Sequence, residues 1–274
     1  MTLEDHAGDV VRKARLMIDV PAADSAAAGG ITPDQLARFE GDGIAPAGID
    51  WDGIARRLEL SGPKLRQLAA GWSPAAVDLS AWRELRVVTT SGEGISVNAY
   101  LLWDEVTREA ALFDTGFDAA PIFALIDGEQ LNLQHIFITH THFDHVAALE
   151  VIRERFPKIR LHTNAKSAPP QHRNRANDFV HLGSLRITNR DTPGHAEEGV
   201  AYIIGTFPED SPNVVVVGDA MFAGSMGGAP GQGALAKSKI CEQILSLPGV
   251  TLICPGHGPL TTVAEQKANN PFVI

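Results

Sequence analysis

The chain has 274 residues, of which 44% are hydrophobic and 20% charged, and its formal net charge is −10. This length and composition suit one large folded domain, or one domain with an appendage. The negative charge argues against nucleic acid as the main partner, because a phosphate backbone needs a basic face. No apolar run approaches the roughly 18 residues that a membrane span requires. An acidic start without an apolar segment, and two cysteines expected to be buried free thiols (Cys241 and Cys254), favour a cytoplasmic protein.

Residues 1–83 are predicted to form a helical appendage, with residues 22–30 as a linker of small side chains. Helical spacing over residues 50–58, then a Ser-Gly turn and a helix carrying Leu65 and Leu68, resembles a helix-turn-helix. Residues 1–80 nevertheless hold eight basic and twelve acidic side chains, which is the wrong sign for phosphate contact. We therefore expect these helices to pack on the rest of the chain, or to form the subunit contact of a homo-oligomer, and expect no nucleic acid partner.

Residues 84–274 are predicted to form a domain in which strands and helices mix. The expected strands are residues 86–89, 97–103, 110–113, 136–138, 159–162, 185–188, 200–204, 214–217 and 251–254. The expected helices are residues 119–126, 146–156, 238–247 and 264–269. Tight turns join the early strands and helices join several later ones. This order favours an α/β fold of two packed sheets with helices outside, rather than one doubly wound parallel sheet.

Metal-binding residue types are concentrated directly after the apolar run 136–138. Residues 139–145 read Thr-His-Thr-His-Phe-Asp-His. In an extended backbone alternate side chains point the same way, so His140 and His142 face one point. Asp144 and His145 follow where a helix should begin, and can aim at a second point nearby. Imidazole nitrogen and carboxylate oxygen suit zinc, iron or manganese, so these residues predict a metal site.

Three more ionisable side chains follow strands in the same way. His195 comes after a Pro-Gly turn, Asp219 ends the strand 214–217, and His257 stands between two glycines after the strand 251–254. Glycine permits the close backbone approach that a crowded site requires, and strand ends fix positions while loops supply chemistry. We expect these side chains to join the cluster at residues 139–145.

These motifs, in this order, resemble the metallo-β-lactamase superfamily over residues 84–274, with the greatest likeness to glyoxalase II and its shorter bacterial relatives. The resemblance implies a four-layer αββα sandwich that here carries an N-terminal helical appendage. It also implies that Asp114 braces the metal loop. By the same resemblance a first metal is held by His140, His142 and His195, a second by Asp144, His145 and His257, and Asp219 bridges them.

The ligand set predicts a hydrolase with two divalent metals, zinc in the first place and iron or manganese otherwise. Two such ions can share one hydroxide, because a metal lowers the pKa of bound water to about 7. Asp144 and Asp219 are the expected catalytic carboxylates, and Asp144 is expected to orient the hydroxide. An acyl-thioester suits this site because a thiolate leaves without a proton donor. The cations expected to contact an acidic small-molecule substrate are Arg173, Arg175, Lys237 and Lys239.

Other functions remain open from the sequence. Glyoxalase II has a C-terminal helical domain for glutathione that this sequence lacks, so the thiol is undetermined. A persulfide dioxygenase would use one iron held by residues matching His140, His195 and Asp219. A lactonase or phosphodiesterase could use the same two metals, whereas true β-lactamases lack the bridging Asp219. A ligand-sensing regulator with DNA-binding N-terminal helices is the non-enzymatic alternative. The glycine-rich residues 224–233 are expected to form a loop at the pocket mouth.

Overall fold

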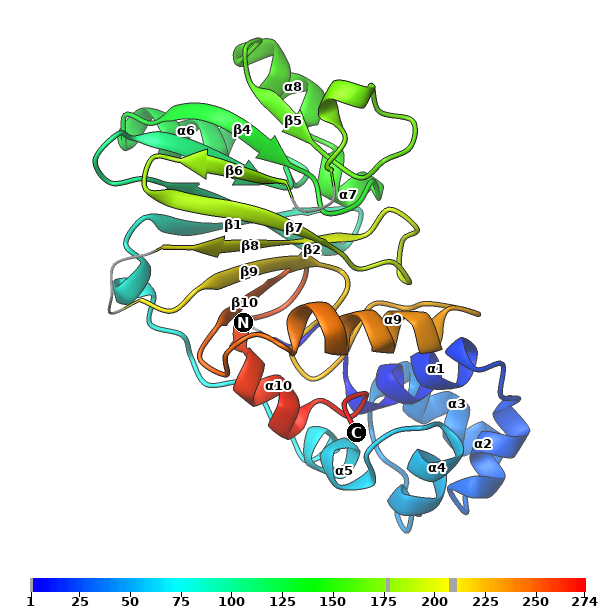
Figure 1. The fold of residues 1–274 in the computed structure, drawn as a ribbon. Helices are drawn as coiled ribbons and strands as arrows, with labels where there is room; N and C mark the ends of the chain where they lie inside the picture. Colours follow the sequence, from blue (N-terminus) through cyan, green and yellow to red (C-terminus); the bar gives the residue numbers. More distant parts are fainter. Residues whose placement is uncertain (1, 176–177, 207–210) are drawn as a thin grey trace.

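The computed structural model describes residues 2–175, 178–206 and 211–274, and its strands form two sheets (Figure 1). The first sheet has the order β1 (Leu85–Gly92), β2 (Ile95–Trp103), β3 (Glu109–Phe113), β4 (Asn132–Phe137), β5 (Arg160–His162). The second has the order β11 (Thr261–Thr262), β10 (Leu252–Pro255), β9 (Val214–Gly218), β8 (Val200–Gly205), β7 (Leu185–Asp191), β6 (Phe179–Leu182). The pairs β3–β4, β4–β5 and β9–β10 are parallel, and the other neighbours are antiparallel.

The two sheets pack face to face, and helices cover their outer faces. Alternate residues of a strand point to opposite faces, so Tyr100 and Phe113 join the core between the sheets, while Leu101 and Leu112 join the core under the helices. The first sheet is covered by α6 (Ala120–Gly128) and α8 (Leu149–Arg155), and α7 (Phe143–Val146) precedes α8. The second sheet is covered by α9 (Gly233–Lys239), its π-helical continuation η3 (Ile240–Ile244) and α10 (Val263–Asn269). The αββα sandwich predicted from the motifs is confirmed.

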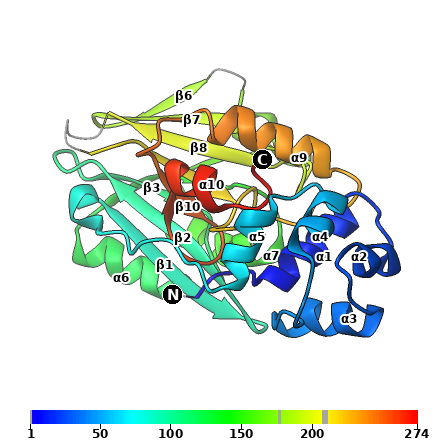
Figure 2. The ribbon, with the colours of Figure 1, turned by 90° about the horizontal axis from the view of Figure 1, so that it is seen from below.

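The N-terminal helices pack on the outer side of the second sheet. They are α1 (Ala7–Met17), α2 (Ala22–Ala28), α3 (Pro33–Asp42), α4 (Trp51–Arg57) and α5 (Gly62–Ala69), followed by the 3-10 turn η1 (Leu79–Trp82). Val10 and Leu36 of these helices share one hydrophobic core with Val215 and Val217 of β9. Figure 2 shows α1 to α4 gathered beyond one end of the sheets, with α5 between them and α10. Packing on the rest of the chain is therefore observed; a subunit contact, and a domain boundary at residue 84, stay predictions.

The α4–α5 pair resembles a helix-turn-helix in sequence, but α5 is engaged within the chain. Leu65 and Leu68 are buried in the shared core. The Lys64 ammonium donates hydrogen bonds to the carbonyls of Lys267 (2.7 Å) and Val273 (2.6 Å) near the C-terminus. A recognition helix would have to present such a cation to phosphate, so this packing speaks against DNA binding.

Five local features differ from what the sequence predicted. The linker expected at residues 22–30 is helix α2, because alanine is the strongest helix former and Ala26 is buried. Strand β6 was not predicted, since only its last residue is buried and the apolar alternation is weak. The helix expected at 146–156 is split into α7 and α8, and the one expected at 238–247 begins at Gly233. Cys254 is buried as expected, but Cys241 is exposed on the outer surface of η3.

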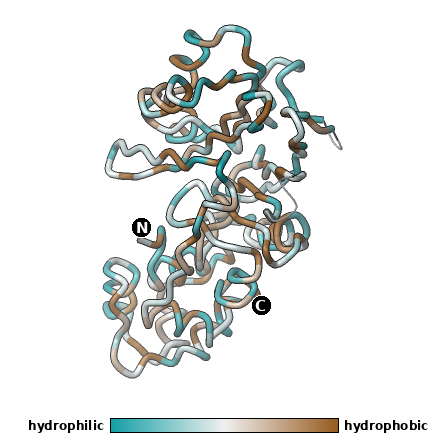
Figure 3. The backbone as a smooth tube through the Cα atoms, turned by 90° about the vertical axis from the view of Figure 1, so that its left-hand side faces the viewer, coloured by the Kyte–Doolittle hydropathy of each residue, from teal (hydrophilic) through white to brown (hydrophobic). Residues whose placement is uncertain are grey.

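Hydrophobic and hydrophilic stretches alternate along the tube in both the sandwich and the N-terminal helices (Figure 3), as expected for elements with one buried face. In the part of the chain that the structure describes, none of the helices has the length and apolar character needed to cross a membrane.

Candidate metal centre

The predicted ligands meet because several strands end at one edge of the sandwich. Strands β3 and β4 are parallel, so Asp114 after β3 lies beside the loop that follows β4, where its backbone NH donates to the Phe137 carbonyl (2.9 Å). Strands β9 and β10 are parallel too, and the Gly256 NH donates to the Gly218 carbonyl (2.8 Å). The β7–β8 connection carries His195 to the same edge, because β8 starts where its antiparallel neighbour β9 ends.

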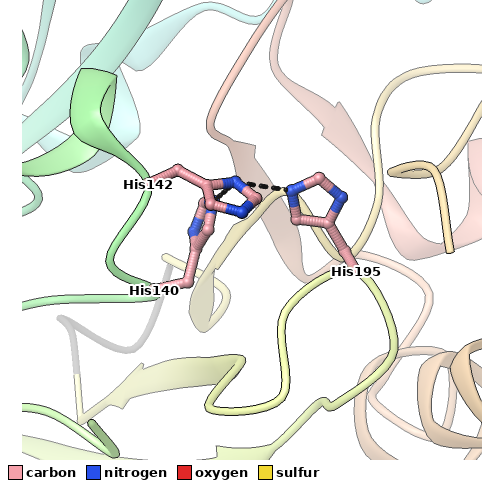
Figure 4. A group of neighbouring side chains, drawn as sticks. All are labelled: His140, His142 and His195. Atoms are coloured by element: carbon pink, nitrogen blue, oxygen red, sulfur yellow. Dashed lines mark hydrogen bonds between the residues drawn. The ribbon is translucent and has the colours of Figure 1, made fainter. Parts of the chain in front are cut away.

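Three histidines form one group at this edge (Figure 4). His140 Nε2 and His195 Nε2 each lie 3.0 Å from His142 Nδ1. Two nitrogens bound to one tetrahedral zinc at about 2.05 Å lie about 3.3 Å apart, so these spacings are close to those of ligands sharing an ion. His140 is buried, His195 is half-buried, and His142 is exposed.

A second group contains Asp144, His145 and His257, whose ligand atoms all lie within 4.8 Å of one another. The Asp144 Oδ2 atom is 3.2 Å from His257 Nε2 and 3.5 Å from His145 Nε2. The Asp219 carboxylate lies between the two groups. Its Oδ1 is 3.3 Å from His145 Nε2, and its Oδ2 is 3.4 Å from His257 Nε2 and 3.6 Å from His195 Nε2. The structure thus brings all seven predicted ligands together.

Two atoms of this cluster are buried and make no hydrogen bond within the described chain, namely His145 Nε2 and Asp219 Oδ1. They face each other at 3.3 Å without hydrogen-bond geometry. A buried polar atom without a partner costs free energy, and native structures contain few of them. A divalent cation accepts both lone pairs at once, so the donor set and these atoms fit a metal ion.

The far nitrogen of three of these rings is held by an acceptor of the protein. His145 Nδ1 lies 2.8 Å from Asp114 Oδ2, and His195 Nδ1 lies 3.0 Å from the Gly228 carbonyl. His257 Nδ1 lies 2.6 Å from the Ser96 carbonyl. Each ring therefore donates from Nδ1, which leaves Nε2, the atom that faces the cluster, as the nitrogen that can bind a metal once it carries no proton. This is the usual way in which proteins fix the tautomer of a metal-binding histidine.

Asp114 lies behind the cluster rather than in it. Its carboxylate is buried, and it accepts hydrogen bonds from the Thr139 backbone NH (2.8 Å) and hydroxyl (2.7 Å) in addition to His145. Its backbone φ is 55°, in the left-handed region. Residues other than glycine rarely adopt this conformation, although aspartate does so more often than most. Asp114 therefore ties the β4 loop to the ring of His145.

Without a cation, protons on histidines of the cluster balance the negative charge of its carboxylates. Burial lowers the pKa of His140 to about 2. Burial would also lower the pKa of His145 and His257, but neighbouring carboxylates outweigh it and raise these pKa values to about 10 and about 11. Burial would raise the pKa of Asp219, yet its contacts with His145 and His257 hold it well below the usual range. A bound cation would compensate the same carboxylates in place of these protons.

The four cations expected at the substrate are not among the seven clustered side chains, and three of them contact other residues of the chain. Lys237 pairs with Glu59 (2.8 Å) and Lys239 with Glu242 (2.9 Å). Arg173 donates to carbonyl groups of its own loop. Arg173 and Arg175 line a separate cavity of about 170 Å³. Their role at a substrate stays a prediction. Of the glycine-rich residues 224–233, which were expected to form a loop at the pocket mouth, residues 224–227 are buried and residues 230–232 are exposed.

Comparisons with known proteins agree with this geometry. The family model described as the metallo-beta-lactamase superfamily matches residues 92–257. The probable metallo-hydrolase YqgX of Bacillus subtilis is 29% identical over 203 residues, which is 65% of this chain and 93% of that protein. The hydroxyacylglutathione hydrolase GloC of Haemophilus influenzae is 27% identical over 64% of this chain and 92% of its own length. The crystal structure of the BLEG-1 B3 metallo-beta-lactamase has a TM-score of 0.60 at 28% identity, covering 69% of this chain and 99% of its own. The family model, the fold and the converging ligands together show that the chain belongs to the metallo-β-lactamase superfamily.

Proposed function

We propose that the chain is a metal-dependent hydrolase of acyl-thioesters, with His140, His142 and His195 holding one divalent metal and Asp144, His145 and His257 a second. Asp219 bridges them. The observation that carries this proposal is the convergence of seven candidate ligand side chains, two of which have a buried atom, His145 Nε2 and Asp219 Oδ1, without a hydrogen-bond partner in the described part of the chain. Zinc is the metal expected first, because imidazole and carboxylate ligands suit it, with iron and manganese as alternatives.

Metal ions bound in these groups would lower the pKa of water to about 7 and polarise a substrate carbonyl, which supplies a nucleophile at neutral pH. Residues of the chain position the histidine rings for metal binding. Asp114 and the carbonyls of Ser96 and Gly228 keep the Nδ1 proton on three rings, so that Nε2 stays free. Asp144 is half-buried, and we assign to it the orientation of the attacking hydroxide while it binds the metal.

A thioester is the substrate class that such a site serves most directly. Water adds to the acyl carbon, the carbon–sulfur bond breaks, and the products are a carboxylic acid and a thiol. A thiol has a pKa of about 8.5, so the thiolate leaves without a proton donor. An amide would need a donor at the leaving nitrogen, whereas the side chains of this cluster are arranged as acceptors. The likeness to a hydroxyacylglutathione hydrolase supports a hydroxyacyl-thioester.

The rival reactions differ in metal count and substrate. A single-iron dioxygenase would use His140, His195 and Asp219, and would leave His142 without a partner although it lies 3.0 Å from both neighbouring histidines. The likeness to a B3 metallo-beta-lactamase makes a β-lactam a necessary control substrate.

The test is metal analysis of the purified protein, followed by assays with a hydroxyacyl-glutathione, a lactone, a phosphodiester, a β-lactam and a persulfide. We expect two metals per chain, and thiol release from the thioester that a chelator abolishes and added metal restores. Oxygen uptake with the persulfide and a single iron per chain, with no thioester cleavage, would overturn the proposal.

A further inference from the structure

Helix α1 and the residues before it lie outside the region shared with the superfamily, yet they contact the loops of the metal centre. The family model begins at residue 92. The relatives YqgX and GloC are covered over 93% and 92% of their lengths but match only 65% and 64% of this chain. A region added to a shared fold can be a passive cap or part of the site. The contacts of Asp5 and Lys13 decide between these roles.

Asp5 and Lys13 hold the loop that follows Asp219. The Ser225 hydroxyl donates to Asp5 Oδ2 (2.5 Å), and the Lys13 ammonium lies 2.5 Å from the same oxygen. Lys13 also donates to the Met226 carbonyl (3.2 Å). Ser225 is fully buried and Asp5 is 6% exposed, whereas the Lys13 side chain is 24% exposed, so this is a partly desolvated ion pair with a third, neutral partner. Removal of one member of such a pair destabilises the protein, because the remaining charge and the Ser225 hydroxyl lose a hydrogen-bond partner.

Two residues after Met226, the same loop supports the proposed metal ligand His195. The Gly228 carbonyl accepts the hydrogen bond from His195 Nδ1 at 3.0 Å. A Cβ atom at Gly227 would lie 2.1 Å from the Asp219 carbonyl oxygen and 2.8 Å from His195 Nδ1. The loop backbone therefore touches the ring of His195 and the chain of Asp219 directly, and it cannot shift toward the cluster without displacing them.

The N-terminal residues reach the second half of the centre as well. A Cβ atom at Gly258, the residue after His257, would lie 3.1 Å from the backbone nitrogen of Glu4. The residues 4–5 thus pass beside the loop of His257 and hold the loop behind His195.

We propose that the Asp5–Lys13 pair is a positioning device of the metal centre, which fixes residues 225–228 so that the Gly228 carbonyl holds His195 in its ligand orientation. This inference rests on the proposed metal site. The added N-terminal region is then a part of the site, not a separate module. Partners that contact a metal-binding histidine directly change metal affinity by about 10- to 100-fold when removed. Because Asp5 acts one contact further away, we expect a loss of about 10-fold for Asp5→Asn.

The same helix offers a matched control. Arg15 pairs with Glu40 through two hydrogen bonds of 2.6 and 2.8 Å, and Glu40 is 8% exposed. This pair is about as buried as that of Asp5, joins α1 to α3, and among the described residues has no hydrogen bond or ion pair with residues 225–228. Glu40→Gln removes a buried charge from the same helical region without touching the loop.

The experiment measures zinc affinity by chelator competition and the visible spectrum of the cobalt-loaded protein, for wild type, Asp5→Asn and Glu40→Gln. Circular dichroism selects samples that are folded. We expect a weaker zinc site and an altered cobalt spectrum for Asp5→Asn, with wild-type values for Glu40→Gln. Equal effects of the two variants, or wild-type affinity in folded Asp5→Asn, would overturn the inference. If Asp5→Asn does not fold, Ser225→Ala decides by the same criterion. A wild-type protein that binds no metal refutes the proposed function itself.

Discussion

Replacing Asp114 by asparagine should weaken metal binding while the sandwich stays folded. The side chain is buried, and one carboxylate oxygen faces both His145 Nδ1 (2.8 Å) and the Thr139 hydroxyl (2.7 Å). Asparagine has the same shape, but only one of its two terminal groups can accept a hydrogen bond. If its carbonyl keeps the bond from the Thr139 NH, its NH2 group meets His145 Nδ1. The ring then moves its proton to Nε2, the atom that faces Asp219 and the metal.

The size of this effect follows from the contacts. Removal of such a histidine partner costs about 10- to 100-fold in metal affinity, which corresponds to about 1.4 to 2.7 kcal/mol. The metal-free protein also loses charge-assisted hydrogen bonds worth about 1.5 to 3 kcal/mol each, partly offset because a buried charge disappears. We expect an unfolding free energy lower by about 2 kcal/mol without metal.

The assay is chelator competition for zinc, combined with urea unfolding with and without metal. The control is Asp104→Asn, because Asp104 is also a buried carboxylate, 4% exposed, and lies far from the cluster in the β2–β3 turn. It accepts hydrogen bonds from Thr107 NH (2.8 Å) and Ser184 NH (2.9 Å). This variant should lose a similar stability and keep wild-type metal affinity. Wild-type zinc affinity in Asp114→Asn would refute the reasoning.

Four further predictions concern the cluster and the loop beside it. His140→Ala should lose metal and at least about 100-fold of the hydrolytic activity together, as metal analysis and a thioester assay will show, and an active metal-free variant would contradict it. Because the metal-free pKa values of His145 and His257 are raised to about 10 and 11, metal uptake near pH 8 should release protons, and calorimetry in buffers of different ionisation enthalpy measures them. The raised pKa values of His145 and His257 also stabilise the folded, metal-free protein. This contribution is complete below the unfolded-state pKa near 6.5 and is lost as the pH rises through about 10 to 11. An unfolding free energy that stays constant over this alkaline range would argue against the raised pKa values. Gly227→Ala should prevent metal loading, because its Cβ would lie 2.1 Å from the Asp219 carbonyl; normal zinc content in this variant would show that the loop can yield.

The ligands were visible in the sequence because each follows a strand whose apolar run is easy to recognise. His140, Asp219 and His257 come within three residues of the ends of β4, β9 and β10. Parallel pairing places the ends of β9 and β10 side by side in the second sheet, and the packing of the two sheets brings the end of β4 beside them. Asp114 follows β3 for the same reason.

The supporting contacts could not be predicted in this way. Two of the three acceptors behind the histidines are backbone carbonyls, of Ser96 and Gly228. Every residue has such a carbonyl, so the residue type does not indicate this role. Asp5 and Lys13 stand in an ordinary amphipathic segment more than two hundred residues before the loop that they hold, and only the fold brings them together. Helix α2 was missed because small residues are compatible with a linker, and its burial against α3 and α4 selects the helix.

The central claim is that seven side chains from four connections between strands and helices hold two divalent ions. The most direct measurement is the metal content of the protein by elemental analysis, after purification and after reconstitution with zinc, iron or manganese. The account predicts two ions per chain in the wild type and their loss in His140→Ala. A folded wild-type protein that retains no ion from any of these solutions would contradict it.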